Sequence, residues 1–201
     1  MSIIPLMIDM KDKKVVVVGG GKVAERRVSS LLDMKCNIFV ISPAITDRLQ
    51  SYHNKKLIQW KEKYFSKSDL DEAFLTIAAT NDTAVNKEVS ISIPPNSLIN
   101  TVDSAEQGNV QFPIQVKRGK LSIAVSTNGA SPTLAKKIQQ ELAKQYDTQY
   151  EGYVDFLYKA RVQVKKSNLP PKERQQILKE LVSNSEYKHP LKQMEWLNKN
   201  K

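Results

Sequence analysis

The most informative apolar pattern lies near the start of the chain, where four valines, Val15 to Val18, follow one another without a polar residue between them. A continuous run of this kind is typical of a strand that is buried on both faces, as in a parallel sheet. Helical and strand patterns then alternate. The predicted order after this strand is helix 23–34, strand 37–41, helix 45–53, strand 57–62, helix 68–73, strand 74–79, helix 84–93 and strand 98–102. This alternation predicts an α/β fold built on a parallel sheet.

Two local signals set helix boundaries within this segment. Ser68 is the predicted cap of the short helix at 68–73, because a serine side chain can accept a hydrogen bond from a free N–H of the first turn. Pro94 and Pro95 end the helix at 84–93, since neither proline can continue it.

The pattern changes after Pro113. Residues 114–117 and 121–126 read as a β-hairpin with its turn at Arg118 and Gly119, and Ser131 then caps a helix that has Pro132 at its first position. A hairpin and one amphipathic helix cannot bury a core of their own. We therefore expect residues 114–146 to pack on a twin in a homodimer.

The remaining chain is helical and basic. Predicted helices run over 150–166, 172–182 and about 191–197, and the aromatic positions of the first, among them Tyr153 and Tyr158, are interpreted as core. The predicted domains are residues 1–113, a dimerisation region at 114–146 and a helical C-terminal region at 147–201.

A glycine motif follows the valine strand. Gly19, Gly21 and Ala24 occupy the G-x-G-x-x-G/A positions of a dinucleotide-binding turn, which makes the predicted first domain Rossmann-like. Gly19 permits the tight turn, Gly21 lets the backbone approach a pyrophosphate, and Ala24 lets the helix pack close to the strand. The pyrophosphate is expected on the free N–H groups near Lys22 and Val23.

The end of the second strand bears on the choice of cofactor. The acidic residue that often binds the adenosine ribose is replaced there by Ser42, which can still bond a ribose hydroxyl, while the backbone of Pro43 and Ala44 can lie along the adenosine. No arginine stands at this position to bind a 2′-phosphate. The sequence therefore favours NAD over NADP, and it counts against S-adenosylmethionine, which usually needs an acidic residue here.

Other strand ends supply further candidates, because ligands of such sheets gather at the carboxyl ends of the strands. Thr80 and Asn81 are suited to binding the cofactor. Asp103 is a carboxylate placed just after a buried strand and is a candidate general acid or base. The alternative interpretation is that Asp103 caps a loop or pairs with a surface lysine.

Charge is unevenly distributed along the chain. Residues 1–110 carry 14 Lys and Arg against 13 Asp and Glu, a net charge of +1, whereas residues 111–201 carry 17 against 8, a net charge of +9. The second half is either an ordinary solvated surface or a region that attracts a polyanionic partner.

The remaining composition narrows the class of protein. Cys36 is the only cysteine, which excludes an internal disulfide, and we interpret it as a small buried apolar residue. No metal site is expected, and neither His53 nor His189 has the setting of a ligand. Because no stretch approaches 18 apolar residues and residues 1–13 lack a signal-peptide pattern, we expect a soluble, cytoplasmic protein without a membrane partner.

Together these residues resemble the precorrin-2 dehydrogenase / sirohydrochlorin ferrochelatase family of sirohaem biosynthesis. The likeness spans nearly the whole chain. It rests on VVVVGGGKVAERR at 15–27, AATND at 78–82, INTVD at 99–103 and RGKLSIAVSTNGASPTLAKKI at 118–138. The last block is the most specific, because a generic dinucleotide fold does not call for it.

The resemblance implies NAD-dependent oxidation of precorrin-2 to sirohydrochlorin, with Asp103 accepting a proton and Ser126 and Thr127 contacting the substrate or cofactor. For that serine–threonine pair, hydrogen bonding at a strand end is an equally supported interpretation. The many carboxylates of precorrin-2 would match the basic second half. One departure is Ser104-Ala105-Glu106, where the family commonly has a proline soon after the aspartate.

Three alternatives remain open. One is a regulatory NAD-binding module of a transporter, which would not need the basic charge of the second half. Some members of the family also insert iron into sirohydrochlorin, and a chain of this length is compatible with one or both activities. A more remote alternative is an NAD-sensing regulator that binds nucleic acid. It would need a recognition helix after a tight turn, and the basic tail has Leu169-Pro170-Pro171 at that place, so no nucleic-acid partner is expected.

Overall fold

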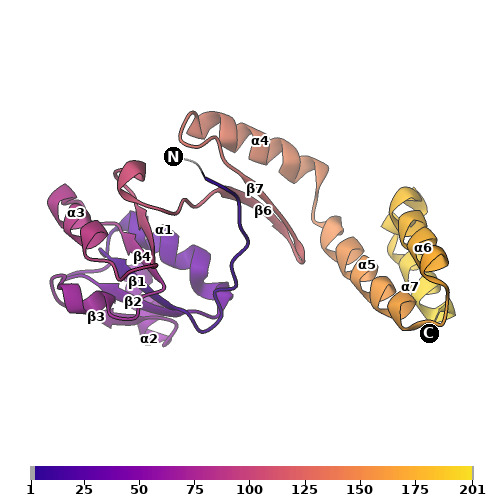
Figure 1. Cartoon of the computed structure of the whole chain (residues 1–201), viewed down its shortest axis with the longest axis horizontal. Coiled ribbons are helices and arrows are strands. Elements are labelled where there is room, and N and C mark those ends of the chain that lie inside the picture. Colours follow the sequence, from indigo (N-terminus) through magenta and orange to yellow (C-terminus); the bar gives the residue numbers. More distant parts are fainter. Residues whose placement is uncertain (1–2, 201) are drawn as a thin grey trace. The chain divides into compact units, whose positions relative to one another are not determined.

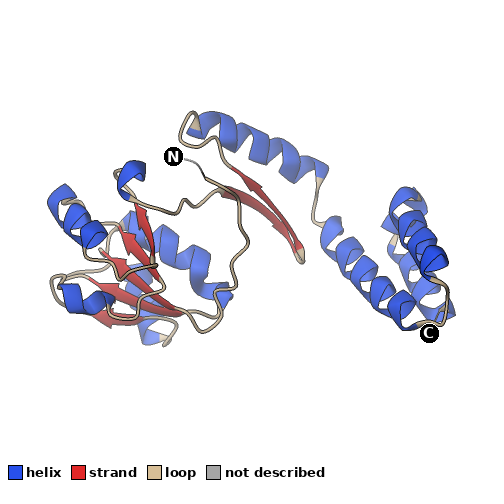
Figure 2. Ribbon diagram, viewed as in Figure 1, coloured by secondary structure: helices blue, strands red, loops and turns tan. Residues whose placement is uncertain are grey.

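A computed structural model describes residues 3–200 of the chain. The chain divides into two compact units, of which the first ends at Phe112 and the second begins at Pro113 (Figures 1 and 2). The first unit holds all the parallel strands, and the second holds a hairpin and most of the long helices. The further division of the second unit at residue 146 stays a prediction.

The first unit is built on a five-stranded parallel sheet with the strand order β3-β2-β1-β4-β5. Its strands are β1 (Lys14–Val18), β2 (Asn37–Ile41), β3 (Gln59–Lys61), β4 (Leu75–Ala78) and β5 (Leu98–Thr101). The central strand β1 pairs with β2 on one side and with β4 on the other. From β1 the chain first adds strands on the β2 side and then, with β4, on the other side. Ligands of open α/β sheets bind at the point where this direction changes.

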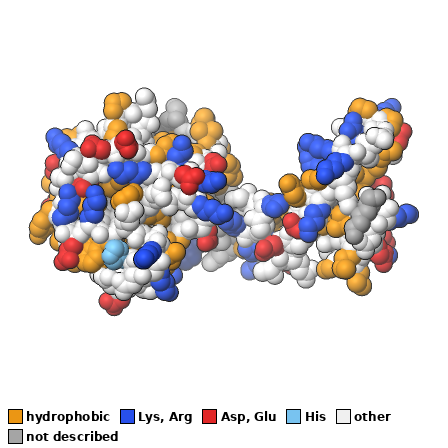
Figure 3. All heavy atoms as spheres, turned by 90° about the horizontal axis from the view of Figure 1, so that it is seen from below, with side chains coloured by type: hydrophobic (Ala, Val, Ile, Leu, Met, Phe, Trp, Pro, Cys, Tyr) orange, Lys and Arg blue, Asp and Glu red, His pale blue; other side chains and the backbone are white. Residues whose placement is uncertain are grey.

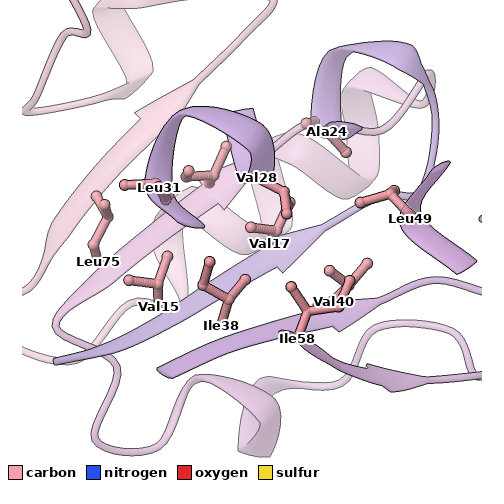
Figure 4. Close-up of a cluster of buried hydrophobic side chains, with 12 residues drawn as sticks. Val15, Val17, Ala24, Val28, Leu31, Ile38, Val40, Leu49, Ile58 and Leu75 are labelled. Atoms are coloured by element: carbon pink, nitrogen blue, oxygen red, sulfur yellow. The ribbon is translucent and has the colours of Figure 1, made fainter. Parts of the chain in front are cut away.

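Helices cover both faces of this sheet. They are α1 (Lys22–Leu31), α2 (Asp47–Asn54) and α3 (Thr83–Ile91), with short 3₁₀ turns η1 (Leu32–Met34), η2 (Lys67–Leu70) and η3 (Ala105–Gln107). Figure 4 shows α1 and Leu49 of α2 packed over alternate side chains of β1 and β2. The opposite face of β1, with Val16 and Val18, packs against Leu70 and against Val89 of α3. The valine run is thus buried on both faces, as predicted.

Several boundaries differ from the prediction. The helix expected at 68–73 with Ser68 as its cap is the 3₁₀ turn η2, and its cap is Ser66. The reason is a reciprocal capping box, in which the Asp69 carboxylate accepts from the Ser66 N–H. The helix expected at 84–93 ends at Ile91, consistent with the bias of a residue before proline away from the helical region.

The second unit begins with the antiparallel hairpin of β6 (Ile114–Arg118) and β7 (Leu121–Val125), in which Arg118 pairs with Leu121. The turn is therefore at Gly119 and Lys120, one residue later than predicted. Helix α4 (Pro132–Gln145) follows, and the Ser131 side chain accepts a hydrogen bond from the Leu134 N–H, which confirms the predicted cap.

Three further helices and a 3₁₀ turn complete the second unit: α5 (Gln149–Lys166), α6 (Pro171–Ser183), η4 (Ser185–Lys188) and α7 (Pro190–Lys199). Their core contains Tyr153, Phe156 and Leu181, and the Tyr153 hydroxyl donates to the Leu181 carbonyl at 3.0 Å. Tyr158 was predicted as core but is exposed, with Lys120 Nζ over its ring. Among the described residues, no helix has the length and apolar character that crossing a bilayer requires.

Candidate functional site

The glycine turn after β1 lies at the carboxyl edge of the sheet, beside the end of β4. Gly19 has a φ of +118°, and a Cβ atom at this position would lie 2.3 Å from the Ala79 carbonyl oxygen. Only glycine fits such a backbone conformation against such a close neighbour. The structural role predicted for Gly19, a tight turn, is therefore what the geometry requires.

Gly20 has an equally strict role that the sequence analysis did not assign. A Cβ atom on Gly20 would lie 1.9 Å from the Ala44 carbonyl oxygen. The turn and the loop after β2 are in direct contact here, and the Thr46 N–H donates to the Gly20 carbonyl at 3.1 Å. The signal that could have pointed to Gly20 was its place in the middle of a run of three glycines, two of which already fill the motif positions.

Gly21 differs from the two glycines before it. No heavy atom lies within 4 Å of the place where its Cβ would be, and Gly21 is the N-cap of α1 without a side-chain hydrogen bond to the first turn. An open backbone at the N-terminus of a helix presents free N–H groups and the positive end of the helix dipole. These are the groups to which a pyrophosphate binds.

The loop after β2 is held in place by side-chain and backbone hydrogen bonds. The Ser42 hydroxyl donates to the Ala44 carbonyl at 2.7 Å, and the Trp60 indole N–H donates to the Ser42 carbonyl at 2.9 Å. The hydroxyl proton of Ser42 is thereby engaged, which leaves its oxygen as an acceptor for a ribose hydroxyl.

A cleft of about 490 Å³ joins these two loops to the ends of β3 and β4. It is lined by Val18, Gly19, Gly20, Gly21, Ile41, Ser42, Pro43, Ala44, Ile45, Thr46, Lys63, Tyr64, Phe65, Ala79, Thr80, Asn81, Asp82 and Val85. Seven of the nine residues predicted to bind the cofactor are in this lining. The other two, Lys22 and Val23, are exposed in the first turn of α1, and the Lys22 side chain pairs with Glu25. The predicted pyrophosphate contact at these two residues is made by their backbone N–H groups.

The segment from Lys63 to Phe65 was missed by the sequence analysis. It follows β3, whose carboxyl end lies at the same edge of the sheet as the other strand ends that were considered. Lys63 brings a cation to this side of the cleft, and its Nζ lies 3.0 Å from Asp69 Oδ2. Burial raises the pKa of the Asp69 carboxyl, but hydrogen bonds from Lys63 and Ser66 outweigh burial and hold this pKa below its usual range.

Asp103 follows β5 and its side chain is exposed. The Asn86 side-chain amide, on α3, donates to Asp103 Oδ2 at 2.9 Å. The same amide is bonded to Thr80, which lines the cleft. The loop after Asp103 has no proline but is closed by the Thr101 hydroxyl, which donates to the Ser104 carbonyl, and by the 3₁₀ turn η3. The candidate base is therefore tied to the cleft through one buried side chain.

Ser126 and Thr127 belong to the second unit. The Thr127 hydroxyl accepts from the Ser131 N–H and donates to the Ser131 carbonyl, both at 3.1 Å, and the Ser126 hydroxyl contacts Asn128. In the structure both hydroxyls shape the loop that leads into α4. Their predicted contact with substrate or cofactor stays a prediction.

The single cysteine has no sign of a reactive role. Cys36 is half-buried beside the core of the first unit, and burial raises the pKa of its thiol. A raised pKa disfavours the thiolate, which is the reactive form. In the part of the chain that the structure describes, no group of three or more His, Cys, Asp and Glu side chains is arranged to hold a metal ion.

The residues of the cleft fit a dinucleotide. An open glycine at a helix N-terminus suits the pyrophosphate, and a serine acceptor at the end of β2 suits the adenosine ribose. Comparison with known proteins agrees with this fit. A family model for NAD(P)-binding domains matches residues 6–114, one for the central domain of a sirohaem biosynthesis protein matches residues 118–145, and one for the SirC C-terminal domain matches residues 150–195.

Full-length relatives decide the family. A precorrin-2 dehydrogenase of Priestia megaterium is 37% identical over 96% of this chain and 95% of its own length. A precorrin-2 dehydrogenase of Bacillus subtilis is 38% identical over 79% of this chain and 98% of its own length. The chain belongs to the precorrin-2 dehydrogenase family. The resemblance that the four sequence motifs indicated is thereby confirmed.

A solved member of the precorrin-2 dehydrogenase family has the same fold. The structure described as "SirC, precorrin-2 dehydrogenase" matches with a TM-score of 0.86 and 36% sequence identity, and the match covers 98% of each chain. The predicted fold class, a Rossmann-like parallel sheet followed by a hairpin and C-terminal helices, is confirmed both by this match and by the strand order of the first unit.

Proposed function

We propose that this chain oxidises precorrin-2 to sirohydrochlorin, with NAD as the hydride acceptor. The observation that carries the proposal is the hydrogen-bonded path from the cleft to a carboxylate: Thr80 lines the cleft, and Asn86 bonds both Thr80 and Asp103. The oxidation removes one hydride and one proton from the macrocycle. NAD supplies the nicotinamide ring that takes up the hydride, and the proton needs a base nearby.

The residues of the first unit divide these tasks. Gly21 and the N-terminus of α1 bind the pyrophosphate, Ser42, Pro43 and Ala44 bind the adenosine half, and Thr80 and Asn81 orient the nicotinamide half. Asp103 accepts the proton from the substrate. Its exposed position lets it reach a substrate that approaches from solvent.

The second unit supplies the attraction for a polycarboxylate. Lys and Arg side chains, blue in Figure 3, gather on its helices, in keeping with the net charge of +9 over residues 111–201. A basic surface raises the local concentration of an anionic substrate. Ser126 and Thr127 are the proposed hydroxyl contacts to precorrin-2. We also propose a cytoplasmic location, since NAD is an intracellular cofactor.

The test is anaerobic turnover of precorrin-2, in which the absorbance of sirohydrochlorin and that of NADH are followed together. We expect the two products to form in a one-to-one ratio. Formation of sirohydrochlorin without NADH would refute the proposal. Addition of ferrous iron or cobalt to the same assay tests the alternative bifunctional activity, which would convert sirohydrochlorin into a metallated product.

We predict a preference for NAD over NADP, and the structure suggests how it is maintained. Lys63 is a cation at the cleft that could pair with a 2′-phosphate, but the buried Asp69 carboxylate already holds it at 3.0 Å. In Asp69→Asn the side-chain oxygen can still accept from the Ser66 N–H, while Lys63 loses its ion partner. We expect NADP⁺ to bind about 10-fold more tightly to this variant, the scale of one charged hydrogen bond, with NAD⁺ affinity little changed.

Calorimetric titration of the parent and the variant with both cofactors makes this measurement. The double variant Asp69→Asn/Lys63→Gln is the matched control, and it should return NADP⁺ affinity to the parent value because the freed cation is gone. Tighter binding of NADP⁺ than NAD⁺ by the parent would contradict the predicted preference for NAD. A gain in NADP⁺ affinity that persists in the double variant would show that Lys63 is not the cause.

We also predict a homodimer that assembles through residues 114–146. In this segment only Val116 and Ala135 are buried apolar side chains, and a two-stranded hairpin is marginally stable without further packing. Light scattering should give twice the 22.8 kDa of one chain. Leu134→Glu, at an exposed position of α4, should weaken the dimer, whereas Leu191→Glu, exposed on α7, should not. A monomeric parent would rule the dimer out.

A further inference from the structure

Asn86 makes an unusually complete set of hydrogen bonds for a helix residue. Its side chain is wholly buried on the inner side of α3. The amide oxygen accepts from the Thr80 N–H at 3.1 Å and from the Thr80 hydroxyl at 2.8 Å. The amide nitrogen donates to the Thr80 carbonyl at 3.1 Å and to Asp103 Oδ2 at 2.9 Å. All four hydrogen-bonding positions of the amide are thus used.

These bonds fix which end of the amide faces Asp103. A backbone N–H can only donate, so the Thr80 N–H requires the amide oxygen on its side. The amide nitrogen is then left for the Thr80 carbonyl and for Asp103. Two independent acceptors on that side agree with this assignment. Asn86 therefore presents a donor, not an acceptor, to the carboxylate.

We propose that Asn86 is a positioning residue for the reaction, which holds the Asp103 carboxylate at a set place and angle relative to the cofactor loop at Thr80. The inference rests on the proposed role of Asp103 as the base. Three of the four bonds of Asn86 secure the Thr80 loop, and a purely structural residue would need no more. The fourth bond reaches an exposed carboxylate on a different strand end.

A fixed bond matters because Asp103 stands on a loop and is exposed. An exposed aspartate samples several rotamers, and a base must lie within hydrogen-bond reach of the proton that it removes. The Asn86 donor favours the rotamer in which Oδ2 faces α3, which leaves Oδ1 free to accept the proton. Because Asn86 also bonds Thr80, a single buried amide fixes the position of the carboxylate relative to the cofactor loop.

The direct test is Asn86→Asp. The remaining side-chain oxygen can still accept from the Thr80 N–H and hydroxyl, but the atom that replaces the amide nitrogen repels both the Thr80 carbonyl and Asp103. We expect kcat to fall by about 10²-fold, the scale of a catalytic group displaced by about 1 Å. The NAD⁺ dissociation constant, measured by titration without substrate, should stay within about fivefold of the parent value.

Asn109→Asp is the matched control. The Asn109 side chain accepts from the Ile99 N–H at 2.8 Å and donates to the Ser97 carbonyl at 2.9 Å, so it secures β5 in a similar way without a bond to Asp103. We expect this variant to keep kcat near the parent value. Thermal unfolding of both variants shows whether each is folded, and the NAD⁺ titration supplies a readout that does not depend on turnover.

A double-variant cycle decides whether Asn86 acts through Asp103. If it does, adding Asn86→Asp to Asp103→Ala should slow the reaction no further, since the group that Asn86 positions is already absent. A kcat near the parent value in Asn86→Asp, full additivity in the cycle, or an equal loss in Asn109→Asp would each overturn the proposal. Failure of the proposed function itself is distinct, because the parent chain would then not oxidise precorrin-2.

Discussion

Asp103→Ala is expected to slow precorrin-2 oxidation by about 10²-fold or more, the usual scale for loss of a general base. Asp103 is the carboxylate at the carboxyl end of β5, and its side chain contacts Asn86, which in turn bonds the cofactor loop. It is not among the residues that line the cleft. The variant should therefore bind NAD⁺ as the parent does while the chemical step slows.

Two further variants separate the loss of a base from damage to the loop. Asp103→Asn keeps the shape of the side chain but cannot take up a proton, so it should be as slow as Asp103→Ala. Glu106→Ala removes an exposed carboxylate from η3 in the same loop and should leave the rate unchanged. Anaerobic turnover gives the rates, and NAD⁺ titration gives the affinities. A near-normal rate in both Asp103 variants would make this aspartate a structural residue.

The parallel sheet could be predicted because its signals are local and mutually consistent. The valine run, the glycine turn and the alternation of strands with helices all indicate the same fold, and the positions of β1, β2 and β5 agree with the prediction to within a residue. Boundaries were less predictable where two candidate caps compete. Ser66 and Ser68 each have an aspartate three positions later, Asp69 and Asp71, so the sequence pattern does not choose between them. In the structure the capping box forms between Ser66 and Asp69.

The site was predicted only where it lies on the strand ends. Gly19, Gly21, Ser42 and Thr80 each lie within three residues of a strand's carboxyl end, so topology alone brings them to one edge of the sheet. Asn86 could not be found in this way. It is a polar residue in the middle of a helix, a position that is usually solvated, and its importance comes from contacts with Thr80 and Asp103 that appear only when α3 packs on the sheet.

Gly20→Ala is expected to cost both stability and NAD⁺ affinity, because its Cβ would lie 1.9 Å from the Ala44 carbonyl oxygen. Backbone atoms on both sides of this contact would have to move apart. Overpacking of this kind typically lowers the free energy of unfolding by about 1–3 kcal/mol. The displaced atoms belong to the loop at Ser42 and to the glycine turn, both of which line the cleft, so NAD⁺ binding should fall by at least about 10-fold as well.

Gly21→Ala is the matched comparison, since its Cβ would meet no heavy atom within 4 Å and its backbone is extended, with φ at −81°. Stability should change by about 1 kcal/mol, the typical scale of an N-cap substitution. The added methyl group would nevertheless occupy the space through which a pyrophosphate approaches the N-terminus of α1, so NAD⁺ affinity should fall by about 10-fold or more. Thermal unfolding and NAD⁺ titration of both variants make the comparison. If Gly21→Ala binds NAD⁺ as tightly as the parent, the pyrophosphate does not lie at this turn, and the assignment of the whole cleft to the cofactor would have to be withdrawn.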